Sequence, residues 1–266
     1  ELRTLVAEHR PAVEQARDRA GLHQPVLQHR AHHADGVLGA QADSLALAIL
    51  LAGVTQRAFL LGLLIGIWAG RLGSFLFRRV LQDGSDGRFD KIKLDPFRFA
   101  MSWTLQGLWV ICTASAALAA ITGGKEPELD LWAWLGLAVW LVGFGIEVVA
   151  DQQKRAFRSR AANEGRFITS GLWAWSRHPN YFGEVVLWAG ITVIAAPALE
   201  GWQLLTLAAP VFVYLLLNRV SGVPMLEARA ERRWGGDPEF RAYTESTPIF
   251  FPRPPAAPAP SATSSR

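Results

Sequence analysis

The chain has 266 residues, of which 50% are hydrophobic and 19% are charged, and its formal net charge is +4. A single cysteine, Cys112, excludes an intrachain disulfide framework, and its position in an apolar run is typical of a small buried hydrophobic residue. The bulk composition is close to that of soluble domains, so the distribution of the apolar residues decides the class of protein.

The N-terminal part of the chain differs in composition from the rest. Residues 1–58 contain no Phe, Trp or Tyr, and they hold five of the six histidines. We predict that residues 1–42 form an atypical, weakly structured extension, or arise from translation out of frame. No cysteine or ordered acidic partner accompanies the histidines, so we predict no metal site there.

Five segments approach the roughly 20 apolar residues that cross a lipid bilayer as a helix. They are residues 58–77, 101–121, 131–150, 182–199 and 202–218. A shorter apolar run, 44–55, is expected to form half of a hairpin with the first of them. These segments predict an all-α fold: a polytopic transmembrane helical bundle with about five to six spans.

The domain boundaries are also predicted from composition. Residues 43–250 are expected to form one membrane-embedded domain. Residues 251–266 are rich in Pro, Ala and Ser and lack core-forming residues, which predicts a disordered tail. Within the first apolar segment, Gly62, Gly66 and Gly70 recur every four residues, and this spacing predicts close approach of a neighbouring helix.

Basic residues alternate between the segments that connect the apolar runs. Six lie in 78–98, one in 122–130, six in 151–180, none in 200–201 and seven from Arg219 onward. Loops on the cytoplasmic side of a membrane carry an excess of Lys and Arg. The alternation therefore predicts a cytoplasmic position for residues 78–100, 151–181 and 219–266.

The segment 146–160 carries charges where a membrane helix is expected to leave the bilayer. Glu147, Asp151, Lys154 and Arg158 recur every three or four residues and therefore share one helix face. One interpretation is a solvated helix end with internal ion pairs, such as Asp151 with Arg155. The other is a ligand site, because a carboxylate at the end of an apolar segment is costly unless it has a partner.

The segment 166–184, RFITSGLWAWSRHPNYFGE, combines turn signals with polar side chains. Gly171 predicts a turn, and Pro179 is suited to open the next helix. Three aromatic residues, Trp173, Trp175 and Tyr181, are also typical of a membrane-interface belt. We predict a polar pocket formed by Arg177, His178, Asn180 and Glu184.

The segment 218–250 follows the last apolar run. Arg219 lies at its start, and Glu227 comes after a Gly-x-Pro break at 222–224. Three further arginines, Arg229, Arg232 and Arg233, predict either a lipid-headgroup patch or an anion site.

Residues from about 141 to 251 resemble the C-terminal half of the steroid 5-alpha-reductase family, and most closely its bacterial branch. The resemblance rests on GLWAWSRHPNYFGE (171–184) and VSGVPMLE (220–227), and it continues upstream in GRFDKIKLDPFRF (87–99) and SWTLQGLWV (102–110). A related superfamily, the isoprenylcysteine and phospholipid methyltransferases, shares the Arg-His-Pro-x-Tyr core. The continuation NYFGE favours the reductases.

The resemblance implies that NADPH binds between the cytoplasmic helix ends and loops. The positions that match cofactor contacts, or that lie in the same motif, are Glu147, Asp151, Arg158, Arg166, His178, Asn180, Tyr181, Glu184 and Arg219. Guanidinium groups suit the phosphates of NADPH, whereas S-adenosylmethionine carries no phosphate.

The catalytic residues remain unknown, because this sequence departs from the family pattern. Trp68 stands where the family has a tyrosine, and an indole can donate a hydrogen bond but cannot release a proton as a phenol can. Glu184 is a further candidate. We expect a bacterial inner-membrane protein that uses NADPH to reduce a carbon–carbon double bond in a lipophilic, steroid-like or isoprenoid substrate.

Two alternatives remain open at this point. One is a membrane methyltransferase that transfers a methyl group from S-adenosylmethionine to an isoprenyl or lipid acceptor. The other is a catalytically inactive membrane scaffold. The expected partners are the lipid bilayer and a lipophilic small molecule, and no nucleic acid is expected.

Overall fold

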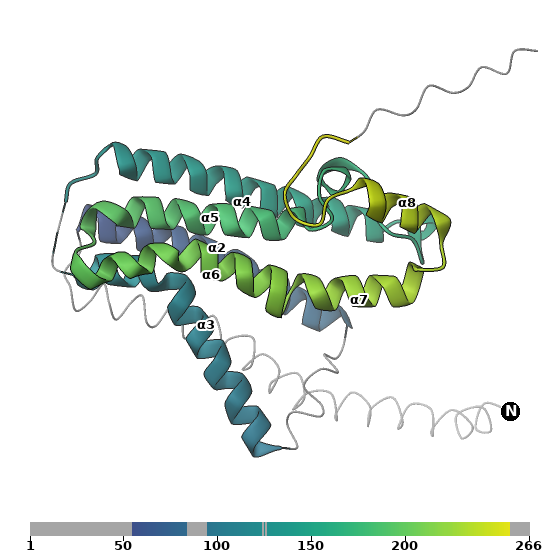
Figure 1. Ribbon diagram of the computed structural model, residues 1–266, viewed down its shortest axis with the longest axis horizontal. Coiled ribbons are helices and arrows are strands. Elements are labelled where there is room, and N and C mark those ends of the chain that lie inside the picture. Colours follow the sequence, from purple (N-terminus) through teal and green to yellow (C-terminus); the bar gives the residue numbers. More distant parts are fainter. Residues whose placement is uncertain (1–54, 84–94, 124, 126, 256–266) are drawn as a thin grey trace, which may run out of the picture. The chain divides into compact units, whose positions relative to one another are not determined.

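The computed structural model describes residues 55–83, 95–123, 125 and 127–255, and within them the chain is helical with no strand (Figure 1). The α-helices are α2 (Gln56–Asp83), α3 (Pro96–Thr122), α4 (Leu131–Arg158), α5 (Pro179–Ala195), α6 (Ala209–Leu215), α7 (Val223–Trp234) and α8 (Pro238–Ser246). The all-α prediction is confirmed. The predicted extension 1–42, residues 44–54 of the apolar run 44–55 and the tail beyond 255 lie outside the described residues.

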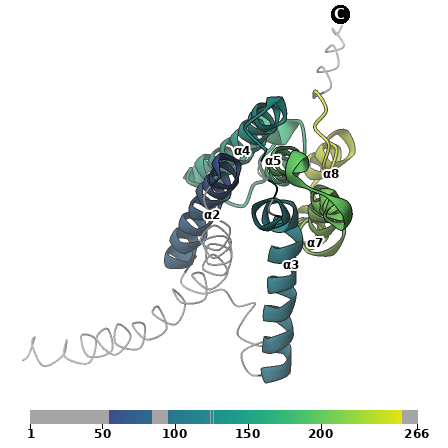
Figure 2. The ribbon, with the colours of Figure 1, turned by 90° about the vertical axis from the view of Figure 1, so that its left-hand side faces the viewer.

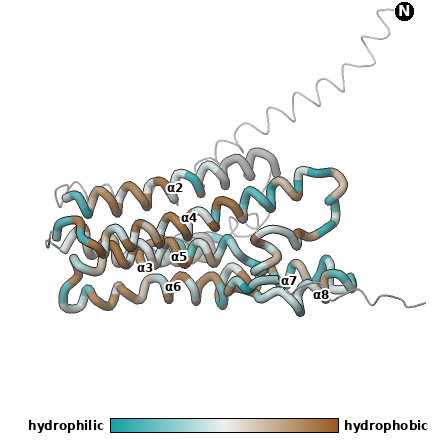
Figure 3. Tube along the Cα trace, turned by 90° about the horizontal axis from the view of Figure 1, so that it is seen from above, coloured by the Kyte–Doolittle hydropathy of each residue, from teal (hydrophilic) through white to brown (hydrophobic). Residues whose placement is uncertain are grey.

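Five helical stretches are long and apolar enough to span a membrane, as the sequence predicted. They are Gln56–Ser74, Ala100–Thr122, Leu131–Arg158, Pro179–Ala198 and Gly201–Trp234. Figure 3 shows hydrophobic residues along much of α4, α5 and α6, with hydrophilic residues mainly in the segments that connect the helices. The chain is an integral membrane protein.

The described residues divide into two compact units, and the single domain over 43–250 stays a prediction. One unit holds 62–83 and 95–110, and the other holds 55–61 and 111–255. Trp68 lies in the first unit, where its side chain is buried. The remaining predicted site residues all lie in the second unit.

Helices α4 and α5 of the second unit lie side by side (Figures 1 and 2), and glycines let their backbones approach closely. A Cβ atom built on Gly143 would lie 2.4 Å from the backbone N of Leu187 and 2.7 Å from the carbonyl O of Gly183. One on Gly190 would lie 2.7 Å from the carbonyl O of Gly136. Gly136 and Gly143 are seven residues apart on α4, and Gly183 and Gly190 are seven residues apart on α5. Small residues therefore line one continuous interface between the two helices.

A buried arginine ties together the end of this unit at which α4 begins. Arg57 donates to the carbonyl O of Ile194 at 2.5 Å, to that of Glu128 at 2.6 Å and to Oδ1 of Asp130 at 3.0 Å. Asp130 also caps α4 by accepting from the backbone N of Ala133 at 3.1 Å. The hydrogen bond from Arg57 lowers the pKa of Asp130.

The last span is irregular. It begins as a 3₁₀ helix, η4 (Gly201–Ala208), continues as α6, and becomes a π-helix, η5 (Leu216–Val220), before α7 begins. Gly222 precedes α7, and Pro224 lies in its first turn. Short π-helical turns are frequent at functional sites, so η5 marks the end of this span as a candidate functional region.

The length of helix α5 is close to the thickness of a membrane. Its 17 residues are about 26 Å long, close to the roughly 30 Å thickness of a bilayer's hydrocarbon core. Ile194, at its C-terminal end, accepts from Arg57. Residues 176–181 lie at the other end of the helix, so the length of α5 separates them from Ile194.

Candidate functional site

The loop between α4 and α5 is held by side chains of α4. Gly171 has φ +64°, a left-handed conformation that favours glycine, and a Cβ atom there would lie 2.5 Å from Oε1 of Gln153. The same oxygen accepts from the backbone N of Leu172 at 2.9 Å. The turn predicted at Gly171 is therefore present, and it begins the short helix η2 (Gly171–Ala174).

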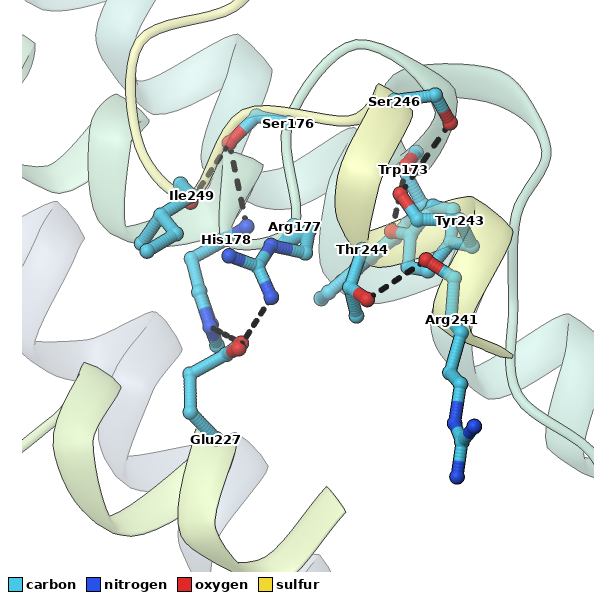
Figure 4. A network of polar contacts seen from close by, with 10 residues as sticks. All are labelled: Trp173, Ser176, Arg177, His178, Glu227, Arg241, Tyr243, Thr244, Ser246 and Ile249. Atoms are coloured by element: carbon cyan, nitrogen blue, oxygen red, sulfur yellow. Dashed lines mark hydrogen bonds and ion pairs between the residues drawn. The ribbon is translucent and has the colours of Figure 1, made fainter. Parts of the chain in front are cut away.

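Trp173 anchors η2 to its neighbours. Its buried indole Nε1 donates to the carbonyl O of Ala150 at 3.0 Å, and Lys154 Nζ lies 4.2 Å from the ring centroid. The carbonyl of Trp173 accepts from the hydroxyl of Tyr243 in α8 at 2.8 Å (Figure 4). Trp173 is thus a packed residue between α4 and α8, rather than a residue of an interface belt.

The chain after α8 runs alongside the loop that leads into α5. The backbone N of Arg177 donates to Pro248 O, and that of Arg253 donates to Trp175 O, both at 2.9 Å. The buried hydroxyl of Ser176 donates to the carbonyl O of Phe250 at 2.9 Å. Residues 251–253, at the start of the predicted tail, therefore belong to the structure of this loop.

The side chains of Arg177 and His178 both point to Glu227, which lies on α7 (Figure 4). Arg177 Nη1 donates to Oε2 of Glu227, and His178 Nε2 lies 2.7 Å from Oε1. Only 7% of the His178 side chain is exposed, against 28% for Glu227. The carboxylate of Glu227 thus contacts both Arg177 and His178, directly before α5 begins.

Burial lowers the pKa of His178 below its ordinary value, although the hydrogen bond with Glu227 acts in the opposite direction. The imidazole is therefore neutral near pH 7. Because an ionised carboxylate only accepts hydrogen bonds, the geometry assigns the ring proton to Nε2.

Helix α5 starts at Pro179, as predicted, and its first turns carry Asn180, Tyr181 and Glu184. All three are half-buried. The Tyr181 ring stacks on the His178 ring with a centroid separation of 5.7 Å and an interplanar angle of 12°. On α7's side, a Cβ atom at Gly222 would lie 2.8 Å from Cε2 of Tyr181, so the two elements enclose that ring.

Glu147 lies beside the same turns of α5. It is buried on α4, and a Cβ atom at Gly183 would lie 2.7 Å from its backbone N. The close packing of α4 on α5 thus places the backbone of Glu147 next to Gly183, in the first turns of α5. Asp151 follows one turn later on α4 and is half-buried.

The three arginines predicted to contact phosphates are exposed. Arg158 ends α4, Arg166 lies in the loop before η2, and Arg219 lies in η5. Arg166 Nη2 is 3.9 Å from Oε2 of Glu239 in α8. The three guanidinium groups come from separate elements of the structure. Their contact with the phosphates of a cofactor stays a prediction.

The contact between Glu227 and His178 is not predictable from the sequence. They are 49 residues apart, and no local spacing predicts such a pair. The Gly-x-Pro break at 222–224 was the available signal, since it marks where α7 turns. Among the described residues, no group of three His, Cys, Asp or Glu side chains could hold a metal ion.

Comparison with protein families matches residues 27–247 to a family described as a protein of unknown function (DUF1295). The chain belongs to the DUF1295 family. The matched region starts inside the segment predicted as an extension and includes most of residues 43–250.

Curated relatives of this DUF1295 protein carry different names. An uncharacterized protein of Schizosaccharomyces pombe, C594.04c, is 24% identical over 229 residues, covering 75% of this chain and 64% of that protein. The probable O-methyltransferase ustE of Ustilaginoidea virens is 27% identical over 148 residues, covering 56% and 50%. The 3-oxo-5-alpha-steroid 4-dehydrogenase 1 of Bos taurus is 28% identical over 117 residues, covering 44% and 40%.

The chain spans less than two thirds of the length of these relatives. The predicted resemblance to steroid 5-alpha-reductases is confirmed as a distant similarity, and a similarity of the same order connects the chain to a methyltransferase. No solved structure matches the chain.

Proposed function

We propose that this protein is an NADPH-dependent reductase of a carbon–carbon double bond in a lipophilic substrate, with its cofactor site on the cytoplasmic side of a bacterial inner membrane. The observation that carries the proposal is the placement of Asn180, Tyr181 and Glu184. They lie in the first turns of α5, beside the buried Glu147, and exposed arginines lie at the end of α4, in the loop before η2 and in η5. The similarity to 3-oxo-5-alpha-steroid 4-dehydrogenases supports it.

The chemistry of the side chains fits a phosphorylated dinucleotide. Arg158, Arg166 and Arg219 are exposed at this end and offer guanidinium groups, which bind phosphate through paired hydrogen bonds. The amide of Asn180 has both a donor and an acceptor and so complements a carboxamide. In this proposal the phosphates would lie at the exposed arginines and the nicotinamide at the half-buried first turn of α5.

The bound cofactor would supply a hydride to the β-carbon of an activated double bond. The protein would hold that carbon in place through the first turn of α5 and exclude water with the surrounding apolar helices. Glu184 is the candidate group in the second unit for delivering a proton to the α-carbon.

A methyltransferase is the second candidate function. It is favoured by the relative named probable O-methyltransferase, which aligns with more of this chain than the steroid dehydrogenases do. In that case the same polar cluster would hold S-adenosylmethionine, and the exposed arginines would have no phosphate to bind.

Ligand-dependent thermal unfolding of the purified full chain in detergent separates these readings. NADPH, NADP⁺, S-adenosylmethionine and S-adenosylhomocysteine are added in turn. A ligand at 100 times its Kd stabilises the folded state by about 2.7 kcal/mol. We expect stabilisation by NADPH and its loss in Asn180→Ala and Arg158→Ala.

Arg160→Ala is the matched control, because Arg160 is as exposed as Arg158 and lies two residues away. Its response to NADPH should equal that of the unmodified chain. Stabilisation by the methyl donor alone would replace the reductase with the methyltransferase. No response to any of the four ligands would favour the inactive scaffold.

A further inference from the structure

The Glu227 carboxylate contacts one residue of the predicted cofactor site, His178, and reaches a second, Tyr181, through it. Its two oxygens are divided between two donors, Oε2 to Arg177 and Oε1 to His178. The His178 ring, in turn, is stacked on Tyr181. A chain of contacts thus runs from α7 through the loop to the first turn of α5.

The Tyr181 ring has a second constraint that does not involve charge. A methyl group at Gly222 would meet the carbonyl O of Leu217 at 2.7 Å and, on the Tyr181 ring, Cε2 at 2.8 Å and Cζ at 3.3 Å, so Gly222 packs against both the preceding turn and the ring. Gly222 and Glu227 flank the start of α7, so one short helix determines both where Tyr181 lies and how His178 is oriented.

We propose that Glu227 is a positioning residue: it holds His178 in the Nε2–H tautomer and, through the stacked rings, holds Tyr181 in its place at the candidate cofactor site. The effect on ligand binding rests on the proposed function, whereas the tautomer does not. Arg177 donates to the other carboxylate oxygen of Glu227, and its guanidinium can only donate.

Glu227→Gln gives a sharp test of this arrangement. The glutamine has one oxygen, and Arg177 requires it as an acceptor. The amide NH₂ group then faces His178, so Nε2 must accept and the ring proton must move to Nδ1. The side chain keeps its size, which limits the risk that the variant fails to fold.

The measurement is ¹⁵N NMR of histidine-labelled full chain in lipid nanodiscs near pH 7. His178 is assigned by difference with His178→Asn, since the other five histidines lie within residues 1–33. We expect the Nε2–H tautomer in the unmodified chain and Nδ1–H in Glu227→Gln. Glu245→Gln, which changes an exposed carboxylate of α8, should leave the tautomer unchanged.

Gly222→Ala tests the second constraint. It should displace Tyr181 but preserve the Nε2–H tautomer, because Glu227 is intact. For whichever of NADPH and S-adenosylmethionine the unmodified chain binds, Kd should rise about tenfold in both Gly222→Ala and Glu227→Gln. Gly236→Ala is the control, since a Cβ atom there would meet nothing within 4 Å.

The outcomes separate the two claims. An Nδ1–H tautomer in the unmodified chain, or an unchanged tautomer in Glu227→Gln, would overturn the positioning role even if NADPH binds. An unchanged Kd in both variants would confine Glu227 to a structural role and overturn the proposal. A tautomer exchange without binding of either ligand would support the orientation of His178 while rejecting the proposed function.

Discussion

Arg177 and His178 illustrate how a polar site can be kept at the end of an apolar helix. A buried cation needs a partner, and removing that partner costs far more than the pair itself contributes. The Arg177 side chain is 13% exposed, and its carboxylate partner comes from a helix that begins 46 residues later. The site is therefore stable only when α7 is docked against the start of α5.

His178 predicts a dependence of stability on pH. Its pKa in the folded protein is below the ordinary value of about 6.5, so the unfolded chain binds more protons at mildly acidic pH. The stability that a neutral His178 contributes is therefore present above about pH 6.5 and is lost as pH falls through the folded-state pKa. Glu227 of α7 opposes this shift, whereas Lys154 of α4 and the neighbouring Arg177 add to it.

Thermal unfolding midpoints of the full chain, measured between about pH 7.5 and pH 5, test this expectation. The midpoint should fall towards acidic pH more steeply in the unmodified chain than in His178→Asn, which cannot titrate at that position. Parallel curves for the two proteins would show that His178 carries no such linkage.

Tyr243→Phe tests the contact between α8 and η2. Burial raises the pKa of Tyr243, so the hydroxyl stays protonated and able to donate to the carbonyl of Trp173. Losing that hydrogen bond should cost about 1 kcal/mol of unfolding free energy. Denaturant titration of the purified chain measures the loss. Ser246→Ala should change little, because Ser246 is exposed and bonds to a carbonyl within its own helix.

For individual residues, the sequence predicted where the backbone turns or a helix begins, but not which side chains contact each other. Gly171 and Pro179 act through their own φ angles and missing atoms, so their effect is local and readable from the chain. The partner of His178 depends on how α7 docks. The Trp173 prediction was incomplete for the same reason, because only packing reveals its bond to Ala150.

Helices α4 and α5 form the rigid support of the site. Four glycines on two helices bring the backbones together, and this packing fixes Glu147 next to Gly183. The sequence pattern instead predicted close approach of a neighbouring helix at Gly62, Gly66 and Gly70. Among the described residues, a Cβ atom on Gly66 or Gly70 meets nothing within 4 Å. A seven-residue spacing on two separate helices is harder to recognise than a four-residue spacing on one.

Gly143→Ala and Gly145→Ala form a matched pair within α4. The first places a methyl group 2.4 Å from the backbone of Leu187, which cannot yield as a flexible side chain can, and overpacking of this kind costs about 1–3 kcal/mol. The second meets nothing within 4 Å. We therefore expect a lower thermal unfolding midpoint for Gly143→Ala only. Equal midpoints would contradict the close interface between α4 and α5.

For the molecule as a whole, the number and placement of the spans were predictable, because apolar length and loop charge follow directly from the bilayer. Each predicted span overlaps one in the structure. The site was predictable only as a set of motif residues near α5. Its contacts with α7 and with residues 248–253 arise from folding of distant segments.

The proposed orientation predicts which loops a reagent outside the cell can reach. With Cys112 replaced by serine, Lys125→Cys and Arg160→Cys each introduce one exposed thiol on opposite sides of the membrane. In intact cells, a membrane-impermeant maleimide should label position 125 and spare position 160 until the cells are permeabilised. The reverse pattern would invert the topology and place the candidate site outside.

Energy transfer from tryptophan to NADPH is the most direct measurement of the central claim. Trp173 and Trp175 lie next to the candidate site, so a nicotinamide bound there should quench their emission and emit in turn. We predict saturable transfer on titration of NADPH into the full chain in nanodiscs, reversed by NADP⁺ and absent in Asn180→Ala. No transfer to NADPH, together with saturable binding of S-adenosylmethionine, would contradict the reductase assignment.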